Sequence, residues 1–151
     1  VYKRQGYYTP DKETLFCKQL LRKENEIIGY ETGLSALNRI GLVSQMPKRR
    51  CIATNLHTKR IPEGMQIEIR KPPIVVNSGN FRYLQILDAI RELDMAPVDT
   101  AKPIDVVRAT VEEFTLKTEM LILMARKYYG QKTLLRTIDI LLEGSYETAR
   151  G

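Results

Sequence analysis

Two short runs of basic residues carry the clearest chemistry in this sequence, which is contact with an acidic partner. Lys48, Arg49 and Arg50 precede a segment expected to be a strand, and Lys59 and Arg60 lie in the loop that follows it. If that strand pairs with the next one, the five charges would lie at one end of the sheet and could contact phosphate. The other reading is that they protect an exposed strand edge from pairing with other chains. The sequence leaves both open.

The distribution of charge adds to this hypothesis. The chain carries a formal net charge of +6, but residues 1–71 hold 14 Lys and Arg against 7 Asp and Glu, while residues 72–151 hold 10 against 11. All the positive excess therefore lies in the first half. This asymmetry suggests a face for nucleic acid or another acidic partner, although a basic, solvated surface would give the same count.

One segment has the residue types of a catalytic site. In Glu68-Ile69-Arg70-Lys71, an acidic residue, one spacer and a basic residue end a predicted strand. Metal-dependent nucleases of the restriction-enzyme type have a lysine where Arg70 stands. An arginine cannot lose its proton to act as a base. We keep an atypical nuclease that uses Glu68 as an alternative and predict that the protein is not an enzyme.

The remaining candidate groups for chemistry are isolated. His57 is the only histidine, and a metal site needs several ligands, so we predict no metal, no cofactor and no catalytic residue. No phosphate-loop, dinucleotide or hydrolase motif occurs. Two acidic pairs at i,i+4 spacing are expected on solvent-facing helix surfaces, and these are Asp88 with Glu92 and Asp139 with Glu143.

The elements that would position these residues follow from periodicity and capping. We expect helices from Thr9-Pro10 to about Lys23 and over about 31–40, with Gly41 as the C-terminal stop. Residues 50–54 and 65–70 are expected to be strands, the second with clear alternation of apolar and polar residues, and Ile74–Val76 is expected as an edge strand. Three more helices are expected, and they cover 81–93, about 102–129, and a last stretch ending at Gly144. The pattern predicts an α+β fold, with a small antiparallel sheet packed by helices and a helical C-terminal half.

Composition places the chain among folded, soluble proteins. Hydrophobic residues make up 43% and charged residues 28%, and no apolar run is long enough to span a membrane. Cys17 and Cys51 are far apart, so we expect two buried free thiols and a cytoplasmic location. Because the chain starts at Val1 and not at Met, we expect a fragment that lacks N-terminal sequence.

Several segments together resemble one protein family. Gly6-Tyr7-Tyr8-Thr9-Pro10 looks like the last strand of a wing leading into a linker helix. Ser35-Ala36-Leu37 followed by Gly41-Leu42 is similar to a small-residue helix that ends in Gly-Leu. Arg50–Asn55 and Gly64–Arg70 look like a strand pair, and Ala125, Tyr128 and the last leucine-rich helix look like C-terminal helices. The chain thereby resembles the abortive-infection type IV antitoxin (AbiEi-like) family and its winged-helix regulator relatives, over roughly Gly6 to Leu142.

The resemblance implies a domain division. Residues 1–10 would be the remnant of an N-terminal winged-helix domain, residues 11–144 the antitoxin or effector domain, and residues 145–151 a tail. Family members are expected to bind their own promoter through the winged helix, which this chain lacks almost entirely, so promoter binding by these residues is in doubt.

The resemblance also implies a function. The C-terminal domain would counter a nucleotidyltransferase-like toxin encoded beside it, so we predict a bacterial antitoxin and transcriptional autoregulator that acts by binding. A plain DNA-binding regulator without a toxin partner remains the main alternative. Lys48, Arg49, Arg50, Lys59 and Arg60 are the predicted contacts to nucleic acid or to an acidic partner.

Overall fold

The first helix packs through a short apolar stripe. The computed structural model describes residues 11–150, with side chains up to residue 142. The predicted start of the first helix at Thr9-Pro10 and the predicted wing remnant over residues 1–10 lie outside the described residues. Helix α1 (Lys12–Leu21) is capped by Asp11, whose carboxylate accepts a 2.7 Å hydrogen bond from the Thr14 backbone. A short hairpin of two strands with two residues each, β1 (Arg22–Lys23) and β2 (Glu26–Ile27), follows directly.

The main sheet within the described residues has the order β3-β4-β5. Strand β3 (Gly29–Glu31) pairs antiparallel with the central strand β4 (Arg50–Thr54), whereas β5 (Ile67–Arg70) pairs with β4 in parallel. The predicted strand pair is therefore correct in position, but the expectation of an antiparallel sheet is wrong for it. Parallel pairing requires a crossover, and residues 55–66 supply one that packs on the α1 side of the sheet.

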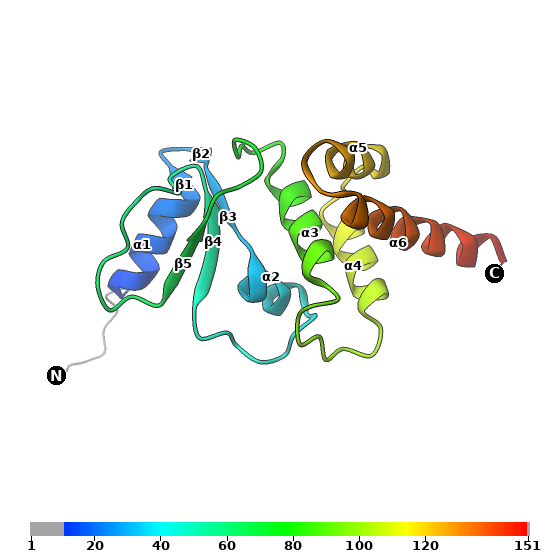
Figure 1. Cartoon of the computed structure of the whole chain (residues 1–151), viewed down its shortest axis with the longest axis horizontal. Coiled ribbons are helices and arrows are strands. Elements are labelled where there is room, and N and C mark those ends of the chain that lie inside the picture. Colours follow the sequence, from blue (N-terminus) through cyan, green and yellow to red (C-terminus); the bar gives the residue numbers. More distant parts are fainter. Residues whose placement is uncertain (1–10, 151) are drawn as a thin grey trace.

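Helices cover the sheet on both faces, as Figure 1 shows. Phe16, Cys17 and Leu20 of α1 form one core with Ile52 and Ile67 of the sheet. Helix α2 (Gly33–Ile40) and helix α3 (Phe81–Glu92) pack on the other face, where the larger core lies. Burial on both faces accounts for the nearly continuous apolar character of β4.

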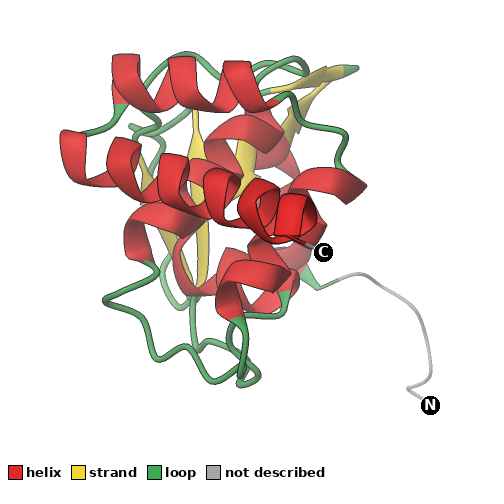
Figure 2. Cartoon of the chain, turned by 90° about the vertical axis from the view of Figure 1, so that its right-hand side faces the viewer, coloured by secondary structure: helices red, strands yellow, loops and turns green. Residues whose placement is uncertain are grey.

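The C-terminal half is helical, as predicted, but its segmentation differs. The expected helix over 102–129 is two helices, α4 (Pro103–Glu113) and α5 (Thr118–Tyr128). The chain turns between them at Thr115, whose φ of 56° is left-handed and cannot continue a helix. Figure 2 views the molecule from this end, with helices in front of the strands.

Two smaller expectations are also corrected. Helix α6 (Gln131–Arg150) continues past Gly144 and through most of the predicted tail. Residues Ile74–Val76 form no strand; instead the Val76 backbone is held by the side chain of Asn55 at 2.8 and 3.0 Å. The α+β class itself is confirmed. Among the described residues, no helix combines the length and the apolar character needed to cross a membrane.

Candidate anion-binding pocket

The five basic residues predicted to bind a partner do not form one cluster. Lys48 and Arg49 are exposed just before β4, and Arg50 turns inward to Glu31. Lys59 follows the opposite end of β4, where its ammonium lies 3.2 Å from Gln19 Oε1 and 5.2 Å from the centre of the Phe16 ring. Arg60 is exposed beside it. Because Arg50 is the first residue of β4 and the loop that carries Lys59 and Arg60 follows its last residue, the two groups of cations start from opposite ends of the strand.

Arg50 instead belongs to a different group of cations, which line one hollow of about 450 Å³. We call this hollow the basic pocket. It is built by α1, the β1–β2 hairpin, β3, α2, the start of β4 and the start of α3. Its lining comprises Thr14, Lys18, Leu21, Arg22, Ile27, Gly29, Tyr30, Glu31, Arg39, Arg50, Phe81, Arg82 and Gln85. Of these described residues, five are basic and only Glu31 is acidic.

Glu31 fixes two of these cations in place. One carboxylate oxygen accepts a 2.8 Å hydrogen bond from Arg39 Nε, and the other accepts a 2.8 Å hydrogen bond from Arg50 Nη2. The Glu31 side chain is only 8% exposed, so its carboxylate forms the buried floor of the pocket, whereas the Arg39 side chain is 65% exposed. Burial disfavours the charge of Arg50, but the hydrogen bond to Glu31 and the charges of Glu31, Glu13 and Cys17 together outweigh it, so the pKa of Arg50 is raised.

Arg82, near the start of α3, lies over two aromatic rings. Its guanidinium carbon lies 4.7 Å from the centre of the Phe81 ring and 4.2 Å from that of Phe114, and Nη1 donates to Gln85 Oε1 at 3.1 Å. Partial burial lowers the pKa of Arg82, while the Glu113 carboxylate raises it and the positive charge of Arg39 lowers it to a smaller extent.

Lys18 and Arg22 complete the set from the α1 side. Both side chains are exposed, and neither has an ion-pair partner among the described residues. With Glu31 already shared between Arg39 and Arg50, the pocket keeps an excess of positive charge. Such a hollow suits an anionic group, because guanidinium and ammonium donors match carboxylate and phosphate oxygens.

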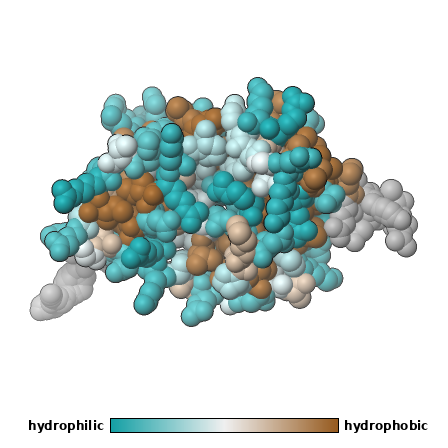
Figure 3. Space-filling view, viewed as in Figure 1, coloured by the Kyte–Doolittle hydropathy of each residue, from teal (hydrophilic) through white to brown (hydrophobic). Residues whose placement is uncertain are grey.

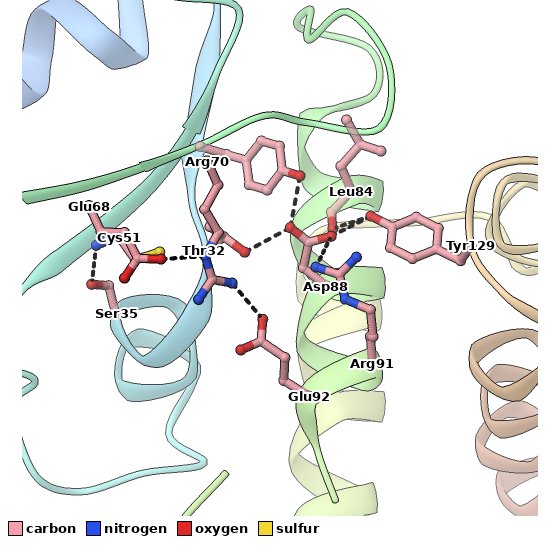
Figure 4. Close-up of polar contacts among 11 residues, drawn as sticks. Thr32, Ser35, Cys51, Glu68, Arg70, Leu84, Asp88, Arg91, Glu92 and Tyr129 are labelled. Carbon is pink, nitrogen blue, oxygen red and sulfur yellow. Dashed lines mark hydrogen bonds and ion pairs between the residues drawn. The ribbon is translucent and has the colours of Figure 1, made fainter. Parts of the chain in front are cut away.

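A second polar centre lies beneath the pocket, around Asp88. The Asp88 carboxylate is buried and accepts hydrogen bonds from Tyr30 at 2.9 Å, Thr32 at 2.7 Å and Tyr129 at 2.5 Å, and Arg91 lies 3.5 Å away (Figure 4). The prediction that Asp88 faces solvent is therefore wrong. Burial and the Asp88 charge raise the pKa of both Tyr30 and Tyr129, which remain hydroxyl donors.

The hydrogen bonds to Asp88 give this centre a structural role. It joins β3, the start of α2, α3 and the end of α5 through charged and neutral hydrogen bonds. Buried carboxylates need such partners, because an unpaired charge away from water is very costly. The four partners therefore stabilise the buried charge of Asp88, and they are Tyr30, Thr32, Tyr129 and Arg91.

The segment considered for nuclease chemistry is occupied by internal ion pairs. Arg70 Nε donates to Glu68 at 2.9 Å, and Arg70 Nη1 donates to Glu92 at 3.3 Å (Figure 4). The Cys51 thiol lies nearby, and burial raises its pKa to about 12. Within the described part of the chain, no three His, Cys, Asp or Glu side chains gather in a way that could hold a metal ion. His57 is exposed on the loop after β4.

Both cysteines are buried and free, as predicted. In contrast, sequence reasoning overlooked Lys18, Arg22, Arg39, Arg82 and Glu31 as members of one site. The only local signal was the i,i+4 spacing of Lys18 and Arg22.

Comparison with known proteins adds no relative. No protein-family model, no curated protein and no solved structure matches this chain. The geometry and the residues themselves therefore carry the functional argument.

Proposed function

We propose that this chain acts by binding, as the effector domain of an AbiEi-like antitoxin and transcriptional regulator, and that it contacts an acidic partner through the basic pocket. The observation that carries the binding part is the convergence of Lys18, Arg22, Arg39, Arg50 and Arg82 on one hollow that contains a single carboxylate. These residues come from separate elements, so the fold assembles them. Their donors suit phosphate oxygens.

The antitoxin part of the proposal rests on the resemblance of the Gly41-Leu42 helix end, the strand pair and the C-terminal helices to that family. It implies a functional partner, a nucleotidyltransferase-like toxin, whose substrates or products carry phosphate. A pocket for anionic groups is compatible with action on the toxin or on its target. Promoter DNA would be bound mainly through the N-terminal winged helix that family members carry.

The test is rescue of growth in a bacterial host. The chain is co-expressed with the product of the gene adjacent to its own, as the original sequence and as the variant Lys18→Gln/Arg22→Gln. Both positions are exposed, so the variant should fold. We expect rescue by the original chain and weaker rescue by the variant at equal protein level.

A matched control removes the same charge elsewhere. Lys12→Gln/Arg126→Gln also loses two exposed cations, and neither of its residues lines the pocket or is a predicted partner contact. It should rescue as well as the original chain. Equal rescue by both variants would remove the pocket from the proposal, and a harmless neighbouring gene product would favour the plain transcriptional regulator.

A further inference from the structure

The basic pocket has more than charge, because one side of it is apolar. Leu21, Ile27 and Phe81 are each partly exposed and line the same hollow as the cations. A site for a bare inorganic anion needs no such wall. Ligand pockets for small organic molecules typically measure ~300–1,000 Å³ and combine apolar walls with a few placed polar groups. The hollow of about 450 Å³ lies in this range.

The two arginines on Glu31 leave donors for a ligand. Arg39 uses Nε and Arg50 uses Nη2 to bind Glu31. Each guanidinium carries five N–H groups, so both retain several donors that no contact with the described residues occupies. The side chains are 65% and 30% exposed, which leaves these donors accessible from solvent. Because Glu31 holds Arg50, the less exposed of the two arginines, part of the conformational entropy that binding would cost is already lost.

We propose that the basic pocket binds a nucleoside polyphosphate. The phosphates lie on Arg39, Arg50 and the flexible Lys18 and Arg22, and the base lies against Leu21, Ile27 and Phe81. This inference rests on the proposed function, in that it names the acidic ligand of the same pocket. It makes the chain a nucleotide-responsive binding protein.

The shape of the site argues for a nucleotide over a long strand of nucleic acid. A strand is tracked by a line of cations along a groove. Here the cations surround one hollow, and Lys59 and Arg60, which would extend such a line, follow the other end of β4. A free nucleotide fills the hollow without needing contacts beyond it.

Isothermal titration calorimetry on the 151-residue chain tests the proposal, with ATP, GTP, CTP and UTP in turn and with inorganic triphosphate as the comparison. We expect saturable one-to-one binding of at least one nucleotide, at least about tenfold tighter than that of triphosphate. Lys18→Gln/Arg22→Gln should weaken that binding at least about tenfold, since charge-assisted hydrogen bonds to phosphate are lost. Lys12→Gln/Arg126→Gln should change it by less than about twofold.

Several results would overturn the inference. These are no saturable binding of any nucleotide, binding no tighter than that of triphosphate, or equal weakening in both double variants. A variant on the apolar wall gives a second readout: Ile27→Asn should weaken nucleotide but not triphosphate binding, and equal effects on both would contradict the placement of the base. Far-ultraviolet circular dichroism confirms that each variant is folded.

The same protein preparation separates the two proposals. A fluorescent single-stranded oligonucleotide is titrated with and without the nucleotide as competitor. Oligonucleotide binding that needs Lys18 and Arg22 but resists nucleotide competition would overturn the nucleotide inference and leave the proposed function standing. Nucleotide binding without growth rescue would overturn the proposed function and leave the nucleotide inference standing.

Discussion

The carboxylate of Asp88 accepts a 2.5 Å hydrogen bond from the hydroxyl of Tyr129, 41 positions further along the chain. The same carboxylate accepts bonds from Tyr30 and Thr32 on its other side. One buried charge therefore ties the sheet to the C-terminal helices. Since β3 also supplies Glu31 to the basic pocket, the position of the pocket floor depends on this link.

Removal of the Tyr129 hydroxyl should lower stability. We expect Tyr129→Phe to reduce the free energy of unfolding by about 1–2 kcal/mol, because a buried charged acceptor loses one donor. The neighbouring Tyr128 is exposed and serves as a matched control, so Tyr128→Phe should change stability by less than about 0.5 kcal/mol. Urea denaturation followed by circular dichroism gives both values. Equal losses would contradict the assigned role of Asp88.

The two ion pairs of Glu31 should differ in strength. Arg50 is 30% exposed and Arg39 is 65% exposed, so solvent screens the Arg39 pair more. Double-mutant cycles built from Glu31→Gln, Arg39→Gln and Arg50→Gln measure each coupling. We expect less than about 1 kcal/mol for Glu31–Arg39 and a larger value, about 1–2 kcal/mol, for Glu31–Arg50. A larger coupling for Arg39 would show that burial does not govern this site.

Close backbone packing at Gly29 should make this position intolerant of a side chain. A Cβ there would overlap the carbonyl oxygen of Leu20 and lie 2.9 Å from that of Ala53. We expect Gly29→Ala to destabilise the protein by more than about 2 kcal/mol, because backbone on both sides must shift. Gly130→Ala meets no atom within 4 Å and should be nearly neutral. Thermal unfolding of both variants under identical conditions checks the contrast.

Alkaline pH should destabilise the fold partly through Cys51. Burial raises the pKa of its thiol from 9.0 to about 12, so the folded state keeps a proton that the unfolded state loses. This contribution is fully present below about pH 9 and is lost as the pH rises towards about 12. We expect a smaller fall in unfolding free energy between about pH 8 and pH 10.5 for Cys51→Ala. An identical fall in both proteins would count against the thiol as a cause.

The C-terminal helices carry further apolar surface that these experiments leave untouched. Figure 3 shows apolar side chains at the end of the molecule where α5 and α6 lie, and the exposed ones include Met120, Leu123 and Leu135.

Local features of the sequence determined much of the fold. Helix α2 ends at Gly41 as predicted, because the left-handed φ of 101° there favours glycine. The strand over residues 50–54 and the burial of both cysteines also follow from residue type. These properties depend on neighbours a few residues apart, which periodicity and capping describe well.

Tertiary structure decided the rest. Whether β5 runs parallel to β4 depends on the path of residues 55–66 over α1, and no local pattern encodes that path. Asp88 has the spacing of a surface carboxylate, yet it is buried because hydroxyls from β3, the start of α2 and the end of α5 reach it. The basic pocket is likewise a product of packing. Its cations are scattered from Lys18 to Arg82, and only the folded chain brings them together around Glu31.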